Sequence, residues 1–100
     1  MVESIGNKIR SIRETKGLLL RQVAAVVEID QALLSKIERG ERNATRYQIL
    51  SIAKFLKIDE AEILTLWLGQ KIANEIKDEK YAKEALKVAE KSIKYFSKTI

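Results

Sequence analysis

Residues Leu18–Arg42 read LLLRQVAAVVEIDQALLSKIERGER, and this stretch decides the fold. Apolar residues recur at helical spacing in two short runs, which predicts one helix over about Leu20–Val27 and a second over Gln31–Arg39. A break of three residues, 28–30, separates the two runs. Its last residue, Asp30, has the side chain of a helix N-cap, so the second helix is expected to begin directly after it.

Two short helices joined by so short a turn need a small residue where they cross and apolar residues beneath the turn. Ala24 supplies the small residue, and Ile29 lies at the turn. The other residues expected to face inward are Val23, Val27, Leu34 and Ile37. The polar outward side of the second helix is then formed by Gln31, Ala32, Ser35, Lys36 and Arg39. Such a pair is a helix-turn-helix, whose second helix typically enters the major groove of DNA.

Further helices are predicted before and after this pair. An isoleucine every three to four residues marks one face of a first helix over about Ser4–Lys16, which Gly17 ends. Gly6 lies inside this helix and should cost about 1 kcal/mol relative to alanine. Thr45 and Gln48 match a capping box, which opens a fourth helix. Its expected buried stripe is Leu50, Ala53 and Leu56.

The remaining chain is predicted to form a fifth and a sixth helix. Asp59 and Glu62 resemble an acidic capping box and open the fifth helix. Asp78 is expected to restart the helix after a polar break at 77–80, and apolar residues then recur at intervals of four and three. We therefore expect a helix-turn-helix domain over residues 1–69 and a helical extension over residues 70–100.

The apolar residues of these last two helices exceed what one small core can bury. Because exposed apolar patches usually mark interfaces, we expect part of them to form a homodimer contact. The expected interface residues are Leu64, Trp67, Leu68, Leu86, Ile93 and Phe96. Two alternatives stay open, namely that these residues only close the core of the domain or that the final helix packs back on its own chain. The thin apolar stripe and the acidic residues of the final helix disfavour a membrane partner.

The composition narrows both the fold and the function. The chain has 100 residues with no proline and four glycines, which favours an all-α protein because strands and sharp turns use more of both. It has no cysteine and no histidine, so thiol nucleophiles, the commonest general base and the usual zinc ligands are missing. We expect no enzyme, cofactor or metal site. The lack of cysteine, of a signal peptide and of a membrane-spanning apolar run favours a cytoplasmic protein.

Positive charge is concentrated near the helix-turn-helix. The net charge is +5, and all six arginines lie in the first 46 residues, where nine Lys and Arg face six Asp and Glu. Since the planar guanidinium suits phosphate, we expect residues beside and after the second helix of the motif to bind the DNA backbone. The candidates are Arg21, Gln22, Arg39, Arg42, Asn43 and Arg46. A solvated basic loop is the alternative. Glu38 is expected to be structural and paired with an arginine.

The outward side of the second helix carries the candidates for base recognition. Gln31 suits adenine, Lys36 suits guanine, and Ala32 suits the methyl group of thymine. The full expected set is Gln31, Ala32, Ser35 and Lys36. In an isolated helix these would be ordinary solvated positions, and only the helix-turn-helix context favours base contact.

The chain resembles the Xre/Cro-type family of regulators, also called lambda-repressor-like. The matching phrases, in family order, are IGNKIRSIRETKGL (5–18), the helix-turn-helix itself, LLSKIERGER (33–42) and ILSIAKFLKI (49–58). Together they cover about residues 5–68. The resemblance implies a five-helix domain that acts as a dimer on a palindromic operator. It extends to small stand-alone regulators that accompany restriction–modification genes or prophages.

Three residues depart from the family pattern. Members usually have Ser or Thr at the position of Leu19, Gln at that of Leu20 and Gly at that of Glu28. Loss of the capping hydroxyl should cost about 1 kcal/mol, and a non-glycine residue in the left-handed turn about 1–2 kcal/mol. We expect the fold to tolerate both, with a changed docking of the second helix, and the two leucines to pack against Leu18 and the first helix.

The sequence therefore predicts a transcriptional regulator that binds double-stranded DNA as a homodimer on an inverted repeat. It would act as a repressor by occluding a promoter or as an activator by contacting RNA polymerase. A second interpretation is the antitoxin of a toxin–antitoxin pair, with the C-terminal helix as the surface that binds the toxin. Because antitoxins also bind DNA, the two interpretations are compatible.

Overall fold

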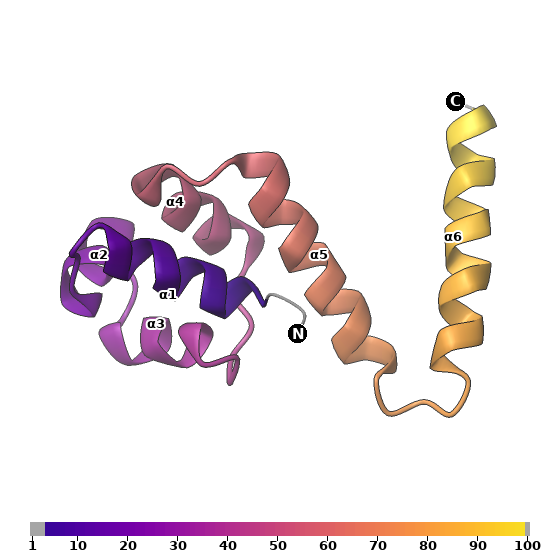
Figure 1. Ribbon diagram of the computed structural model, residues 1–100, viewed down its shortest axis with the longest axis horizontal. Helices are drawn as coiled ribbons and strands as arrows, with labels where there is room; N and C mark the ends of the chain where they lie inside the picture. Colours follow the sequence, from indigo (N-terminus) through magenta and orange to yellow (C-terminus); the bar gives the residue numbers. More distant parts are fainter. Residues whose placement is uncertain (1–3, 100) are drawn as a thin grey trace. The chain divides into compact units, whose positions relative to one another are not determined.

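The computed structural model describes the backbone of residues 4–99 and the side chains of residues 4–97. Within this range the chain forms six helices and no strand (Figure 1). They are α1 (Ile5–Thr15), α2 (Leu20–Val27), α3 (Gln31–Glu38), α4 (Arg46–Leu56), α5 (Glu60–Ile76) and α6 (Ala82–Thr99). The predicted all-α class is confirmed. None of these helices combines the length and the apolar composition needed to cross a lipid bilayer.

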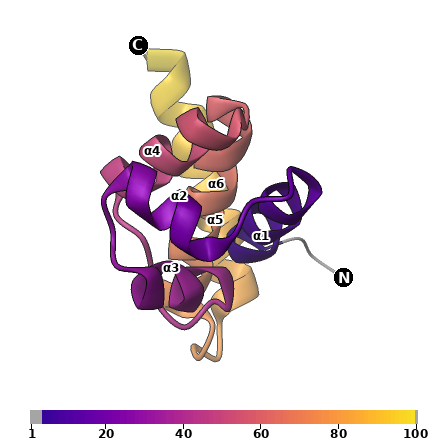
Figure 2. The same cartoon turned by 90° about the vertical axis from the view of Figure 1, so that its left-hand side faces the viewer.

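The chain divides into two compact units, residues 1–70 and residues 71–100. In the first unit, α1 and α2 each pack against both α3 and α4. Figure 2 views this unit from the side of α2 and α3, which the short turn connects. The first part of α5 completes the core with Ile63 and Trp67. The fully buried side chains at the centre are Ile9, Val23, Leu34, Ile37, Ile49, Ile52, Leu56 and Ile63.

Side chains cap α1, α3, α4 and α5 where the sequence predicts. Ser4 Oγ, Asp30 Oδ1 and Asp59 Oδ2 each accept a hydrogen bond from an N–H in the first turn of their helix, at 3.1, 2.7 and 3.0 Å. Thr45 and Gln48 make both bonds of the expected capping box, at 3.1 and 2.9 Å. Each bond satisfies an N–H that a helix start leaves without an internal partner.

The ends of α2 and α4 use left-handed residues that are not glycine. Gly40 has the expected positive φ of 77°, but Glu28 and Lys57 also have φ of 57° and 59°. In both turns the following isoleucine, Ile29 or Ile58, donates its N–H five residues back, at 3.1 or 2.9 Å, and packs against the core. This packing offsets the strain of about 1–2 kcal/mol that each left-handed residue brings. The prediction for Glu28 is confirmed, whereas the left-handed conformation of Lys57 was not predicted.

Gly6 lies where α1 comes closest to the end of α3. A Cβ at this position would lie 2.4 Å from the carbonyl oxygen of Glu38 and 2.6 Å from that of Ile37. Both neighbours are backbone atoms, so α1 and α3 would have to move apart to admit a side chain. The glycine that weakens α1 as a helix is therefore the residue that allows the two helices to meet.

The buried stripe of α4 differs from the predicted one. Leu50 is half-buried and does not belong to the core, while Ile49 and Ile52 are fully buried. The stripe consists of Ile49, Ile52, Ala53 and Leu56. Because α1 and α2 both pack on α4, its buried arc follows the i, i+3, i+4, i+7 pattern and excludes Leu50.

Two predicted helix boundaries are also wrong. α3 ends at Glu38, and Arg39 is its C-cap instead of its last residue. Asp78 does not begin α6. Asp78 lies in the first of two successive turns, and α6 begins only at Ala82. The turns are closed by bonds from Glu79 N–H to the Ile76 carbonyl at 2.9 Å and from Ala82 N–H to the Glu79 carbonyl at 3.3 Å.

Candidate nucleic-acid interface

The helix α3 is anchored on its inner side. Leu34 and Ile37 are fully buried in the core, as predicted, and Leu33 packs against its edge. Asp30 fixes the first turn through its bond to the N–H of Ala32. A helix of eight residues is marginal by itself, so this packing determines its position and leaves its other side available.

A buried ion pair between Arg13 and Glu38 ties α1 to the end of α3. Arg13 Nε donates to Oε2 of Glu38 at 2.8 Å and Nη2 to Oε1 at 3.0 Å, while Nη1 donates to the carbonyl of Leu18 at 2.8 Å. The side chains of the pair are 10% and 4% exposed. The hydrogen bonds to Glu38 raise the pKa of Arg13 above its usual range, against the effect of burial. The expectation that Glu38 pairs with an arginine is confirmed.

The four residues predicted to read bases lie together on the outer side of α3. Gln31, Ala32 and Lys36 are exposed, and Ser35 is half-buried. Positions one, two, five and six of a helix share one face, so their side chains form a single patch. In the first unit this patch comes from a helix held at both ends, by the Asp30 cap and by the pair at Glu38.

The predicted phosphate ligand Arg39 is exposed but already bonded to other residues of its own chain. Its Nε donates to Oε2 of Glu41, and its Nη1 donates to Oγ of Ser35 at 2.6 Å. The bond to Glu41 raises the pKa of Arg39, and the same bond lowers the pKa of Glu41, so both groups stay charged. The bond between Arg39 and Glu41 was not predicted, because only Arg39 was considered as a phosphate ligand.

Trp67 holds the loop that follows α3. It is 8% exposed, and its Nε1 donates to the carbonyl of Ala44 at 2.8 Å. The guanidinium carbon of Arg46 lies over its ring, 5.9 Å from the centroid. Trp67, one of the residues predicted at a dimer interface, is therefore largely buried within its own unit. Of the other predicted phosphate ligands here, Arg42 and Asn43 are exposed.

The start of α2 carries the other two predicted phosphate ligands, Arg21 and Gln22, both exposed. Oε1 of Gln22 accepts the N–H of Leu19 at 2.7 Å, the return bond of a capping box, and the backbone carbonyl of Leu19 accepts the N–H of Gln22 at 3.0 Å in place of the missing hydroxyl. Because Oε1 faces the N–H of Leu19, the amide nitrogen of Gln22 remains as a donor. Leu19 and Leu20 were both expected to pack against Leu18 and the first helix. Leu20 packs against the core, whereas Leu19, an extended N-cap residue, is 49% exposed.

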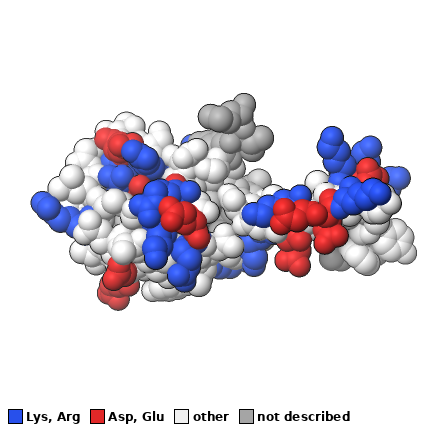
Figure 3. Space-filling model, turned by 90° about the horizontal axis from the view of Figure 1, so that it is seen from below, with Lys and Arg blue, Asp and Glu red and all other residues white. Residues whose placement is uncertain are grey.

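Basic side chains gather on the α3 side of the first unit. Figure 3 views the molecule from that side and shows Lys and Arg atoms over α3 and the following loop, with acidic atoms between them. Neither Arg21 nor Arg42 has an acidic partner among the described residues. This surface combines hydrogen-bonding side chains with positive charge, the combination that duplex DNA requires.

Comparison with known proteins agrees with this geometry. Residues 9–63 match the model of the Helix-turn-helix family. The chain belongs to the Helix-turn-helix family. The uncharacterized HTH-type transcriptional regulator y4dJ of Sinorhizobium fredii is 32% identical over 65 residues, which cover 65% of this chain and 84% of that protein. The crystal structure of the clp gene regulator ClgR from Corynebacterium glutamicum matches with a TM-score of 0.58 over 92% of this chain and 84% of that chain, at 24% identity, and so shares the fold.

Membership of this family confirms the Xre/Cro-type resemblance drawn from the sequence. The helix-turn-helix protein is thus a DNA-binding regulator and not an enzyme. The matched segment contains the whole of α2, α3 and α4, and with them every predicted base-reading and phosphate-binding residue.

The other predicted interface residues of the regulator have unequal exposure. Leu64 is half-buried and packs against the core of the first unit, whereas Leu68 is exposed. In the second unit, Leu86, Ile93 and Phe96 are exposed on α6. Val88 and Tyr95, which were not predicted, are exposed on the same helix, so its apolar side is broader than the narrow stripe expected.

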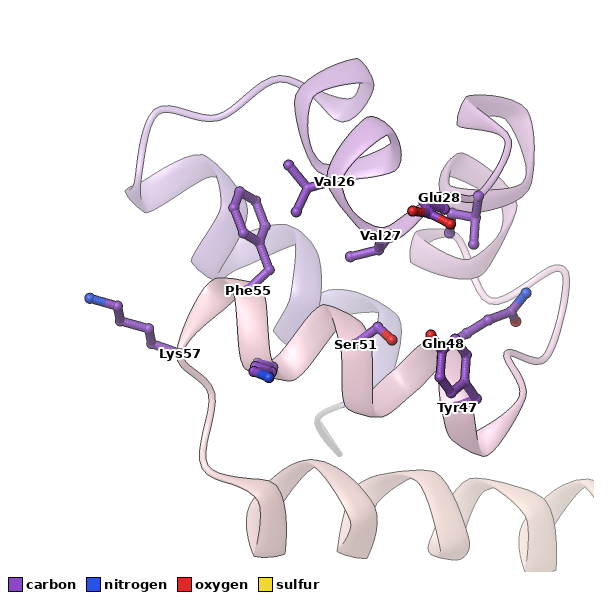
Figure 4. A pocket seen from close by; sticks show the side chains of 10 residues that line it. Val26, Val27, Glu28, Tyr47, Gln48, Ser51, Phe55 and Lys57 are labelled. Carbon is purple, nitrogen blue, oxygen red and sulfur yellow. The ribbon is translucent and has the colours of Figure 1, made fainter.

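The regulator also has a groove that no sequence pattern predicted. It has a volume of about 690 Å³ and lies between the end of α2 and α4. Figure 4 shows Val26 and Phe55 at one end, and Tyr47 and Gln48 at the other. Its two walls are about 20 residues apart in the chain, which is why no local pattern indicated it. Among the described residues, no group of acidic, His or Cys side chains is placed to hold a metal ion.

Proposed function

We propose that this regulator binds double-stranded DNA as a homodimer and places one α3 in the major groove of each half of an inverted repeat. The observation that carries the proposal is the exposed polar patch on α3, a helix fixed by core packing and by the Arg13–Glu38 pair. A rigid helix with one free polar face meets the geometric need of groove recognition. The half-sites would lie about 34 Å apart along one face of the duplex.

In this proposal the patch reads base edges. Gln31 binds adenine with both atoms of its amide, Lys36 donates to guanine, and Ala32 contacts the methyl group of thymine. Ser35 donates its hydroxyl hydrogen, since its oxygen already accepts from Arg39. The position of these residues on the first turns of α3 supports their role, because the N-terminal part of a recognition helix usually lies deepest in the groove.

The phosphate contacts lie on both sides of this patch. Arg21 and the free amide nitrogen of Gln22 bind from the start of α2, where the helix dipole also favours an anion. The loop after α3 contributes Arg42 and Asn43, and the start of α4 contributes Arg46, whose guanidinium lies over the ring of Trp67. Arg39 takes part only after it exchanges its bond to Glu41 for one to phosphate.

Selection of bound duplexes from a random pool tests base reading. We expect an inverted repeat whose half-site centres are about 10 base pairs apart. Q31A and K36A should each cost about 1–3 kcal/mol and relax the preference at one base pair, whereas R42A should weaken binding to all sequences alike and flatten the salt dependence. Unchanged sequence preference in Q31A and K36A would show that another surface reads the bases.

The dimer contact is proposed on the exposed apolar side of α6, with Leu68 as a further contact. Leu86, Ile93 and Phe96 recur at intervals that place them on one face of the helix, a pattern typical of paired helices. I93E should therefore give a monomer in sedimentation analysis. K87E, at an exposed position on the opposite, charged side of α6, serves as the control. A wild-type monomer at micromolar concentration would contradict the homodimer.

The same exposed side of α6 favours a second candidate, the antitoxin type of module in which this helix binds another protein. Co-purification with the product of an adjacent gene, lost in I93E, would support it. A homodimer that is stable by itself and binds its operator without a partner would count against it. RNA polymerase contact, which would make the dimer an activator, requires an in vitro transcription assay on the selected operator.

A further inference from the structure

Glu41 lies among the basic side chains at the end of α3. It is not one of the residues predicted to contact DNA. Its Oε2 accepts from Nε of Arg39, whose Nη1 is held by Ser35. The side chains of Arg39 and Glu41 are 52% and 54% exposed, so the pair is formed at the surface that faces the proposed duplex. The bonds to Glu41 and Ser35 together use two of the five N–H groups of the guanidinium.

The charges around Glu41 keep it ionised. The hydrogen bond from Arg39 lowers its pKa most, and the positive charge of Lys36 lowers the pKa further. Glu41 is thus an anion close to one proposed base-reading residue and one proposed phosphate ligand. A DNA phosphate that approaches the same edge of Arg39 meets a carboxylate already in place, and the two anions repel each other.

We propose that Glu41 competes with DNA phosphate for Arg39 and thereby limits the sequence-independent part of DNA binding. The inference rests on the proposed function, since it needs α3 to face the duplex. Phosphate contacts supply nearly all of non-specific binding, whereas base contacts supply sequence preference. A carboxylate that occupies one phosphate ligand therefore lowers the affinity for every duplex and leaves the base preference unchanged.

The test is a set of four proteins titrated with one fluorescent random-sequence duplex between about 50 and 200 mM salt. We expect E41Q to bind about two- to fivefold more tightly than wild type, the equivalent of one exposed ion pair. The slope of log K against log salt should steepen by about 0.9, one additional phosphate contact. In the wild-type background, R39A should change the affinity less than twofold, which corresponds to the low end of the free energy of an exposed ion pair. In the E41Q background, R39A should remove the whole gain in affinity.

A matched control separates this competition from a general charge effect. Glu14 forms an exposed pair with Arg10 at 3.4 Å on α1, so E14Q makes the same charge change at a comparable pair. E14Q should leave the affinity nearly unchanged. Equal gains in E41Q and E14Q, or an R39A effect of the same size in both backgrounds, would overturn the role of Glu41. If wild type binds no duplex even at low salt, the proposed function itself fails.

Discussion

Removal of Glu38 offers a direct measure of how firmly α3 is held. In Glu38→Ala, Arg13 loses two charge-assisted hydrogen bonds, those from Nε and Nη2, and keeps only the bond to the Leu18 carbonyl. Such bonds contribute about 1.5–3 kcal/mol each, and the Arg13 charge then remains in a site where its side chain is only 10% exposed. The expected loss is about 3–5 kcal/mol, the usual cost of breaking a buried pair at one end.

Urea unfolding followed by circular dichroism measures this loss, and the midpoint of thermal unfolding should fall by more than about 10 °C, given about 4–8 °C per kcal/mol for a domain of this size. Glu14→Ala is the control, because the exposed pair of Glu14 with Arg10 contributes less than about 1 kcal/mol. Replacement of both buried partners, Arg13→Met with Glu38→Leu, should restore most of the stability, since no unpaired charge remains.

A loss below about 1 kcal/mol in Glu38→Ala would refute the reasoning, because it would mean that Arg13 reaches water without difficulty once its partner is gone. A double variant as unstable as the single one would also contradict it. In that case the loss would come from the shape of the side chains and not from the uncompensated charge.

Three further predictions concern the packing and the titration of the domain. Gly6→Ala should lower the free energy of unfolding by about 1–3 kcal/mol, because its Cβ meets backbone carbonyls of α3. Gly69→Ala, in α5 with no atom near its added Cβ, should raise the free energy of unfolding by about 0.5–1 kcal/mol. Shifts of the same sign for the two variants in urea unfolding would contradict this. Ile49→Ala should cost about 2–5 kcal/mol and Leu50→Ala less than about half of that, and equal losses would place both side chains in the core. With no histidine or cysteine in the chain, stability should be level between about pH 6 and 8 and fall below about pH 5. A carboxylate whose pKa is lowered in the folded state, such as Glu41, stabilises the fold above the pKa of the unfolded chain. It loses this effect as the pH falls through the lowered pKa. A change of stability near neutral pH would therefore contradict the prediction.

The sequence by itself determined the helices of the first unit and the surface proposed to contact DNA. The caps at Ser4, Asp30 and Thr45 could be predicted because each bonds to a backbone group within three residues. The inward and outward sides of α3 could be predicted for a similar reason, since helical geometry alone places residues three and four apart on one face. The candidate base-reading residues follow from that periodicity.

Only the tertiary structure decided which distant residues meet. Glu38 was expected to pair with an arginine, but the choice of Arg13, 25 residues away, depends on how α1 is rotated against α3. The burial of Trp67 against Ala44, 23 residues away, depends on the same packing. So does the close approach of α1 to α3 at Gly6. A local pattern fixes the face of a helix to within about one residue, whereas an ion pair or a close approach requires ångström-level placement of two helices. That placement results from filling the shared core, and no single segment encodes it.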